Sequence, residues 1–280
     1  MIYTVTLNTN ESVAGKGVNI SLVLKKLGVD SVATGIMANG ENNVFKELDQ
    51  AKIEHHFIKQ DQVAQLDLFS SDEQKVPAEK QQELLDYLKK QLKMGDILVV
   101  AGSFAPGIDP VYLTDLAKLA QEKMTHLVVD VPYVNVLDIL PLHPLLIKPN
   151  ATELKHWFNK ENEDLTTDEL VELAHDMVVR GADHVLLSLA SDGAAIVNLM
   201  HAYVAPAPKV NVVSEDGAGD TLLATFLAGM LENHTPVRNL ADSIAAATDT
   251  TQNERLTDFE STSELQRQIM AHKITFEEAE

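Results

Sequence analysis

The chain has 280 residues, 45% of them hydrophobic, which is enough to bury a sizeable core and argues against wholesale disorder. Its 42 acidic residues against 22 lysines and arginines give a formal net charge of −20, which argues against nucleic-acid binding. There is no cysteine, no apolar run of membrane-spanning length and no signal-like start, so we expect no disulfide, no membrane association and a cytoplasmic location.

Short apolar segments alternate with helix-like segments through most of the chain. The apolar segments are nearly continuous, which is typical of parallel strands covered on both faces. The pattern predicts one domain over residues 1–280, with a doubly wound α/β sheet and ligands at the carboxyl ends of its strands. In chain order we expect strands at 2–8, 31–37, 96–102, 126–131 and 184–190, and helices at 17–27, 43–51, 109–123, 135–142, 167–180, 221–232, 236–253 and 261–272.

The region at 55–80 has the weakest pattern. It contains two short alternating stretches, HHFIK at 55–59 and QLDLFS at 65–70. They predict either a small flap over a binding site or an ordinary edge strand, and the pattern does not choose between them.

The stretch SEDGAGDTLLATFLAGM at 214–230 places small residues directly before an apolar helix. Gly217, Ala218 and Gly219 let a ligand approach the backbone, and the first-turn amides and the helix dipole form a cradle for an anion. Asp220 stands beside that cradle, where a carboxylate suits a base better than a cap. Phosphoryl transfer requires a proton acceptor and donors for the transferring oxygens, and this turn offers both.

The segment AGKGVNIS at 14–21 is a second glycine-rich helix start. Gly15, Lys16 and Asn19 suit an anionic or polyhydroxyl ligand, although a simple strand-to-helix turn explains the pattern equally well. The spacing does not match a P-loop, and the absence of a G-x-G-x-x-G after the first strand argues against a Rossmann dehydrogenase.

The segment IKPNATEL at 147–154 follows another strand. Asn150 and Glu153 have the spacing of a helix capping box, which is the simpler interpretation. The functional alternative places both residues near Mg²⁺ or nucleotide phosphates, with Lys148 close by.

Two further strand ends carry polar residues. Ser103 lies in AGSFAPG at 101–107, and Ser188, Asp192 and Gly193 lie in SLASDG at 188–193. Each segment is a ligand-contacting loop or an ordinary turn.

The motifs GKGxN, GSxxPG, KPNxxE and GAGD occur here in that order, and together they resemble the PfkB branch of the ribokinase-like carbohydrate kinases. The resemblance is greatest to 1-phosphofructokinases, with tagatose-6-phosphate kinases next. It implies a three-layer α/β/α sandwich with a mostly parallel sheet and a β lid, of which a remnant remains at about 55–72. It also implies ATP and Mg²⁺ as cofactors, a sugar phosphate as substrate, and a homodimer that pairs through the lid.

The resemblance also assigns roles to residues. Asp220 would be the base, and the backbone of Gly217, Ala218 and Gly219 the anion hole. The sugar phosphate would be held by Gly15, Lys16, Asn19 and Ser103, and the nucleotide phosphates and Mg²⁺ by Lys148, Asn150 and Glu153. The ATP site would be lined by Ser188, Asp192, Gly193, Ser214 and Asn253.

The chain departs from the family pattern in its substrate and lid segments. It lacks the sugar-gripping Asp after TLN, the second glycine before Lys16 and the arginine of the lid, and it adds Glu215 and Asp216 beside the ATP site. A weak or inactive lidless relative explains these departures. We favour segments omitted from the sequence, because TLN joins TNESVAGKG too abruptly for the strand to reach its helix, and an intact mass of 30.7 kDa would exclude omission. A non-catalytic nucleotide- or sugar-phosphate-binding relative stays an alternative to an enzyme that converts fructose 1-phosphate to fructose 1,6-bisphosphate.

Overall fold

A computed structural model describes residues 1–8, 15–38, 42–60 and 75–276 of the chain. Within these residues the strands form one ten-stranded sheet in the order β10-β9-β8-β7-β6-β5-β4-β1-β2-β3. All pairs from β3 through β7 are parallel, and β8, β9 and β10 continue the sheet in antiparallel pairs. The strands are β1 (Ile2–Thr6), β2 (Ser31–Ala38), β3 (Glu54–Gln60), β4 (Ile97–Ala101), β5 (His126–Asp130), β6 (Leu146–Ile147), β7 (Val185–Ser188), β8 (Ala194–Val197), β9 (His201–Ala205) and β10 (His272–Thr275).

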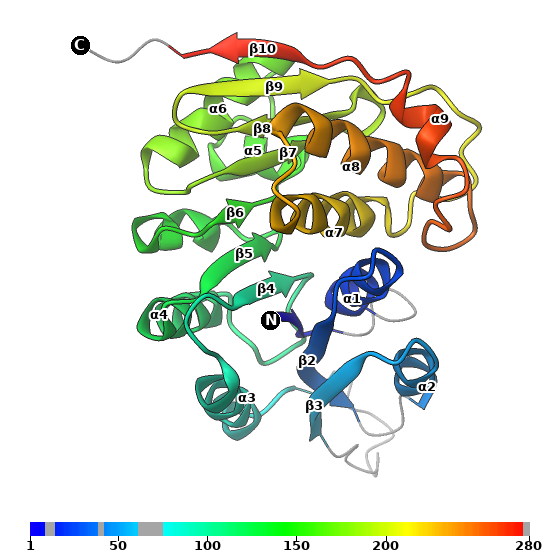
Figure 1. The fold of residues 1–280 in the computed structure, drawn as a ribbon. Coiled ribbons are helices and arrows are strands. Elements are labelled where there is room, and N and C mark those ends of the chain that lie inside the picture. Colours follow the sequence, from blue (N-terminus) through cyan, green and yellow to red (C-terminus); the bar gives the residue numbers. More distant parts are fainter. Residues whose placement is uncertain (9–14, 39–41, 61–74, 277–280) are drawn as a thin grey trace, which may run out of the picture.

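Helices cover both faces of the sheet, which gives three layers (Figure 1). Side chains alternate along the central strands: Leu98 and Val100 of β4 join one apolar cluster, and Ile97 and Val99 join the other. The helices are α1 (Lys16–Lys26), α2 (Asn42–Gln50), α3 (Ala78–Gln91), α4 (Tyr112–Lys123), α5 (Ala151–Trp157), α6 (Thr167–Val179), α7 (Ala218–Leu231), α8 (Pro236–Thr251), α9 (Thr262–Gln266) and the 3₁₀ helices η1 (Val134–Leu142) and η2 (Ala190–Asp192).

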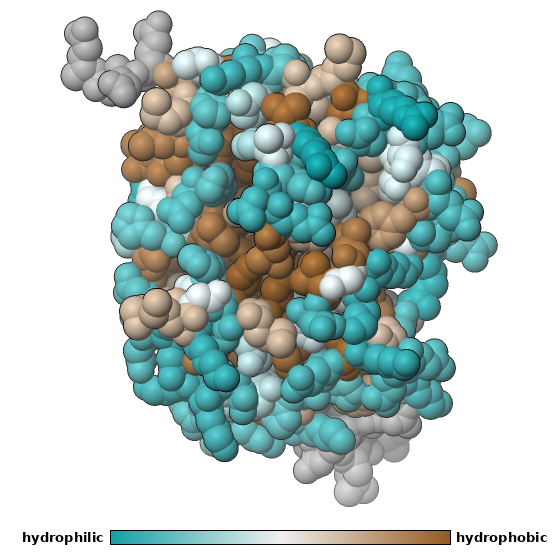
Figure 2. Space-filling view, viewed as in Figure 1, coloured by the Kyte–Doolittle hydropathy of each residue, from teal (hydrophilic) through white to brown (hydrophobic). Residues whose placement is uncertain are grey.

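The predicted α/β class and mostly parallel sheet are confirmed. Helices α3, α4, α5 and α6 contribute to one cluster, and helices α1, α7, α8 and α9 to the other. Hydrophilic side chains cover most of the face in Figure 2, as the high charge predicts, with apolar side chains gathered near its centre. Among the described residues, every helix is too short or too polar to cross a membrane.

Several sequence-based expectations need correction at the carboxyl-terminal end of the chain. The predicted helix at 261–272 is only the short helix α9, and the chain then forms β10, which pairs with β9. The hairpin of β8 and β9 was not expected. Long-range pairing decides these elements, and local periodicity does not reveal it.

Two further expectations concern the amino-terminal half. Residues 55–59 lie in β3, which pairs in parallel with β2 at the edge of the main sheet, whereas 65–70 lie outside the described residues. β1 ends at Thr6 and α1 begins at Lys16, and residues 9–14 between them lie outside the described residues. The omitted segment therefore stays a prediction.

Candidate active site

The carboxyl ends of the parallel strands bring together segments that are far apart in the sequence. Helix α1 packs closely on β1 because Gly17 has no side chain: a Cβ there would lie 2.5 Å from Thr6 Oγ1. This close packing carries Asn19 to the first turn of α7, where its Nδ2 donates a hydrogen bond of 2.8 Å to Asp220 Oδ2. Two of the predicted motifs therefore meet directly, 201 residues apart in the chain.

The start of α7 has no side-chain cap. Gly217 is the N-cap and has a φ of +79°, a left-handed conformation that favours glycine. A Cβ at this position would also lie 2.6 Å from Leu256 Cδ2, in the loop after α8. The backbone path through Gly217 thus depends on glycine for two reasons, and it leaves the helix start available to an anion.

Asp220 is 4% exposed, although it is an ionisable residue. Its pKa is raised from 3.8 to about 6, chiefly by burial and in addition by the nearby Asp130 carboxylate, against the opposing effects of Lys16, Asn19 and Lys148. A carboxyl group with such a pKa is ionised at neutral pH and still binds a proton far better than an exposed aspartate.

Asp130, at the end of β5, was missed in the sequence analysis. Its side chain is 1% exposed and lies between two lysines: Lys148 Nζ is 3.1 Å from Oδ2 and Lys16 Nζ is 3.4 Å from Oδ1. An acid that ends a buried strand was a signal that could have identified it, because ligands collect at that edge of the sheet. The local pattern gave no sign of its lysine partners.

The two lysines approach from different elements. Lys16 begins α1, and its methylene groups pack over Gly102, where a Cβ would lie 3.6 Å from Lys16 Cβ. Lys148 is 4% exposed, and its Nζ lies 3.6 Å from the position of a Cβ at Gly219. The ammonium group of Lys148 therefore lies beside the start of α7. Asp130 raises the pKa of Lys16, which keeps Lys16 positively charged.

Asn150 and Glu153 form the capping box that their spacing predicts. Glu153 N donates to Asn150 Oδ1 at 2.8 Å, and Asn150 N donates to Glu153 Oε2 at 2.9 Å. Glu153 nonetheless belongs to the same electrostatic cluster: burial raises its pKa, while Lys148 and Lys16 act to lower it. Capping and a role beside phosphates are therefore compatible for Glu153.

The fit of Mg²⁺ follows from the chemistry of these oxygens. Carboxylate and amide oxygens suit this ion, which usually keeps several waters and binds phosphate oxygens as well. The described residues contain no group of three or more histidine, aspartate and glutamate side chains arranged to hold a metal. Glu153 and Asn150 thus fit Mg²⁺ only as part of a site that phosphates and water complete.

The remaining predicted residues fall into separate places. Asn8 Nδ2 donates to Ser103 Oγ at 2.9 Å, which joins the ends of β1 and β4. Ser188 ends β7 and forms an isolated bridge with Asn150. Asp192 and Gly193 form the turn into β8, and a Cβ at Gly193 would lie 2.0 Å from Ala205 O, so the turn interpretation accounts for this glycine.

Ser214 and Asn253 lie together at the end of α8. Ser214 N donates to Thr251 O at 3.3 Å, and Asn253 Nδ2 donates to Asp249 O at 2.9 Å. The hydroxyl of Ser214 accepts a hydrogen bond from Asp216 N at 3.1 Å and so shapes its own loop. The structure therefore gathers Asp220, Asn19, the two lysines and Glu153 into one cluster, with Ser214 and Asn253 beside α8.

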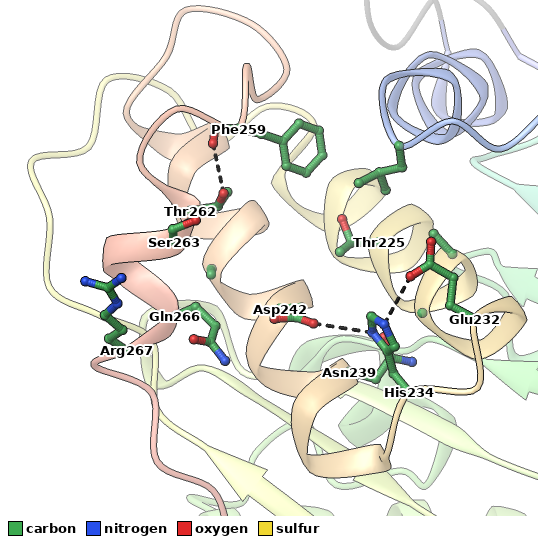
Figure 3. Close-up of a pocket in the computed structure, with 14 residues that line it drawn as sticks. Thr225, Glu232, His234, Asn239, Asp242, Phe259, Thr262, Ser263, Gln266 and Arg267 are labelled. Atoms are coloured by element: carbon green, nitrogen blue, oxygen red, sulfur yellow. Dashed lines mark hydrogen bonds and ion pairs between the residues drawn. The ribbon is translucent and has the colours of Figure 1, made fainter.

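A cavity of about 390 Å³ lies elsewhere, between helices α7, α8 and α9 (Figure 3). Its walls include Thr225 and Glu232 from the middle and end of α7, whereas Asp220 lies in the first turn. His234 stands between two carboxylates there, with Nε2 at 3.0 Å from Glu232 and Nδ1 at 3.4 Å from Asp242. None of the predicted site residues lines this cavity, so it is separate from the candidate active site.

Comparisons with known proteins agree with the order of the motifs. The family model described as pfkB family carbohydrate kinase matches residues 6–261. The chain is 32% identical to D-tagatose-1-phosphate kinase of Bacillus licheniformis over 76% of this chain and 73% of the relative. It is 30% identical to 1-phosphofructokinase of Borreliella burgdorferi over 96% of this chain and 90% of the relative.

Solved structures show the same fold. A Staphylococcus aureus protein, described under the provisional name of a phosphofructokinase, superposes with a TM-score of 0.85 at 26% identity, covering 99% of this chain and 100% of that one. Phosphofructokinase-2 of Escherichia coli has a TM-score of 0.77 at 21% identity over 95% of this chain and 94% of its own. The chain therefore belongs to the pfkB family of carbohydrate kinases, and it is a sugar-phosphate kinase.

Proposed function

We propose that the protein transfers the terminal phosphoryl group of ATP to fructose 1-phosphate and so forms fructose 1,6-bisphosphate. The observation that carries this proposal is the buried carboxylate of Asp220 at the uncapped start of α7, close to two lysines. Similarity to 1-phosphofructokinase over 96% of this chain supports the choice of sugar phosphate.

The chemistry follows from the placement of these groups. Asp220 accepts the proton of the acceptor hydroxyl as its oxygen bonds to the terminal phosphorus, and the bond from that phosphorus to ADP breaks. The backbone amides at 217–219 stabilise the charge on the transferring oxygens. Lys16 and Asn19 hold the sugar phosphate, and Lys148 contacts the phosphates of the nucleotide.

The nucleotide and metal sites complete the proposal. Ser188, Asp192, Gly193, Ser214 and Asn253 would line the ATP site. Glu153 and Asn150 would hold Mg²⁺ through water and phosphate oxygens. The bound ion would supply neutralisation of phosphate charge.

Two other functions have specific support. Phosphorylation of a tagatose phosphate is favoured by the relative named D-tagatose-1-phosphate kinase. A non-catalytic binding role is favoured by Glu215 and Asp216, which are exposed acids beside the proposed ATP site. An enzyme assay separates the three functions.

The test is ATP turnover by the purified protein with fructose 1-phosphate, tagatose 1-phosphate and tagatose 6-phosphate. We expect the highest kcat/KM with fructose 1-phosphate. Asp220→Asn should lower kcat by about 10²- to 10⁴-fold with the fold intact, because the variant has no base. The matched control is Asp258→Asn, an exposed aspartate outside the site, which should keep wild-type turnover. Undiminished turnover in Asp220→Asn would refute the role of this carboxylate.

The proposal also covers the oligomeric state and the cellular location of the protein. Residues 1–280 would form a single kinase domain, with the lid remnant at about 55–72 and a homodimer that pairs through this region. β3 lies at the edge of the sheet, where a second copy has access to it. Light scattering on the purified protein tests the dimer. The cytoplasmic location stays a prediction.

A further inference from the structure

Asp130 is buried at the centre of the charged cluster, yet the proposed reaction leaves it without a role. It ends β5 and lies between α1, which carries Lys16, and the segment after β6, which carries Lys148. We propose that Asp130 is a positioning residue whose carboxylate holds both ammonium groups beside the start of α7, where a phosphate can bind them. This inference rests on the proposed function, because it assigns the two lysines to phosphates.

The burial of the three groups supports this role. Removing a charge from water is costly unless the charge is paired, and one carboxylate here faces two cations. The Asp130 side chain is 1% exposed and that of Lys148 is 5% exposed, so neither has ready access to water in place of its partner. With Asp130 present, Lys148 keeps a fixed position in a site that contains no phosphate.

The contacts of the two lysines show where Asp130 holds their ammonium groups. Lys148 Nζ is close to Gly219, one of the residues proposed to form the anion hole. Lys16 remains 36% exposed, and its contact with Asp130 is the longer of the two, at 3.4 Å. An incoming phosphate therefore reaches Lys16 from solvent and meets Lys148 at the helix start. Each ammonium group has three N–H donors, so both lysines bind the phosphate and keep Asp130 as a counter-ion, and none of the three charges is left buried and unpaired.

The charge of Asp130 has a second, measurable effect. Asp220 is faced by Lys16 and Asn19 from α1, by Asp130 from β5 and by Lys148 from the segment after β6. Asp130 repels the ionised form of Asp220 and also engages the two cations that favour it. Removal of its charge should therefore lower the pKa of Asp220 and make it a weaker base.

The test compares three variants by their kcat and by their pH profiles of kcat/KM, whose acid limb reports Asp220 in the free enzyme. In Asp130→Asn, kcat should fall about tenfold and the acid limb should move about one unit to lower pH. Asp130→Glu retains the charge but displaces the lysines, so kcat should fall while the acid limb stays at the wild-type pH. The matched control is Asp96→Asn, which removes a buried aspartate from the amino-terminal end of β4, where it pairs with the Met1 ammonium group at 2.8 Å. The control should leave the profile unchanged.

A second measurement does not depend on turnover. Carbon-13 NMR of aspartate carboxyl groups, with the Asp220 signal identified by its loss in Asp220→Asn, follows the titration of Asp220 directly. A lower pKa in Asp130→Asn than in Asp96→Asn and Asp130→Glu supports the inference, and circular dichroism confirms that each variant is folded. Should Asp130→Asn misfold, Asp130→Glu still decides: wild-type kcat and KM in that variant overturn the positioning role.

The outcomes separate this inference from the proposed function. An active wild-type enzyme whose acid limb and Asp220 titration are the same in Asp130→Asn as in Asp96→Asn overturns the role of Asp130 alone. A wild-type protein without turnover on any of the sugar phosphates overturns the proposed function. In that case the NMR titration still tests the effect of Asp130 on Asp220.

Discussion

Asp220 shows how burial serves reactivity at the expense of stability. The folded chain holds this carboxyl group where its pKa rises from 3.8 to about 6. The folded state thus binds the proton more tightly than the unfolded chain does. The stabilising contribution of the protonated group is fully present below pH 3.8 and is lost as the pH rises through about 6.

Asp220→Asn should therefore stabilise the fold at neutral pH although it lowers turnover. The shift in pKa corresponds to a gain of up to about 3 kcal/mol in the free energy of unfolding at pH 8. Denaturant unfolding of both proteins at pH 8 and pH 4.5 measures the difference. We expect it to shrink at the lower pH, where wild-type Asp220 is largely protonated. A difference of the same size at both pH values would contradict this explanation.

The activity of the wild-type enzyme should follow the same group. Asp220 accepts a proton only when it is ionised, so kcat/KM, which reports the free enzyme, should fall as the pH is lowered through about 6. The measurement is kcat/KM from pH 5 to pH 9. A profile that stays flat across pH 6 would show that another group accepts the proton.

Some site residues could be predicted from the sequence and others could not. Asp220 and Gly217 could be predicted, because a glycine before a helix and an acid in its first turn are recognisable from a few neighbouring residues. Asp130 carried a signal as an acid at a strand end, but its lysine partners could not be predicted, and neither could the role of Leu256, because only the fold brings Lys148 near Asp130 and Leu256 near Gly217.

At the scale of elements, the loop after α8 supports the start of α7. Asp249 of α8 is 2% exposed and accepts hydrogen bonds from the hydroxyls of Thr257 and Ser261 and from the backbone N–H groups of Phe259 and Ser261. These bonds fix the path of the loop that carries Leu256 against Gly217. The carboxylate of Asp249 thus contributes to the shape of the proposed anion hole without facing it.

Asp249→Asn should loosen this loop, because an amide offers one acceptor oxygen where the carboxylate offers two. We expect the free energy of unfolding to fall by about 2–3 kcal/mol, the loss typical of hydrogen bonds to a buried charged group. Asp258→Asn is the matched control, since Asp258 is exposed and accepts a hydrogen bond from Glu260 N. Equal stability of the two variants in denaturant titrations would contradict the anchoring role.

Helices and strands could be predicted where the local sequence pattern agrees with the position of the element in the fold. Apart from β3, whose sequence EHHFIKQ is mostly polar, the strands of the parallel part of the sheet are short apolar runs, and α6 begins at the capping box of Thr166 and Glu169, so local signals suffice there. β10 was not predictable, because Lys273 and Ile274 become a strand only through pairing with Tyr203 and Ala202 of β9.

At the scale of the whole molecule, the net charge of −20 acts against the compact state. Like charges repel one another, and salt screens this repulsion over about 10 Å at 0.1 M ionic strength. The melting temperature should therefore rise as NaCl is increased from 10 to 300 mM, as calorimetry would show. A fall over this range would mean that ion pairs such as Arg255–Glu47 outweigh the repulsion.

The negative net charge contrasts with the two lysines of the site. The chain repels anions overall, yet Lys16 and Lys148 lie together at one edge of the sheet, next to the uncapped start of α7. Four motifs in the right order were enough to identify the family from the sequence, because each marks one strand end or helix start at this edge. The charge balance within the cluster emerged only from the fold.

A crystal structure with a non-hydrolysable ATP analogue and fructose 1-phosphate tests whether phosphoryl transfer takes place at Asp220 and the start of α7. Our account predicts that the terminal phosphate contacts the amides at 217–219 and that the acceptor hydroxyl lies about 3 Å from an Asp220 carboxylate oxygen. Nucleotide bound away from the start of α7, for example in the cavity of Figure 3, would contradict it.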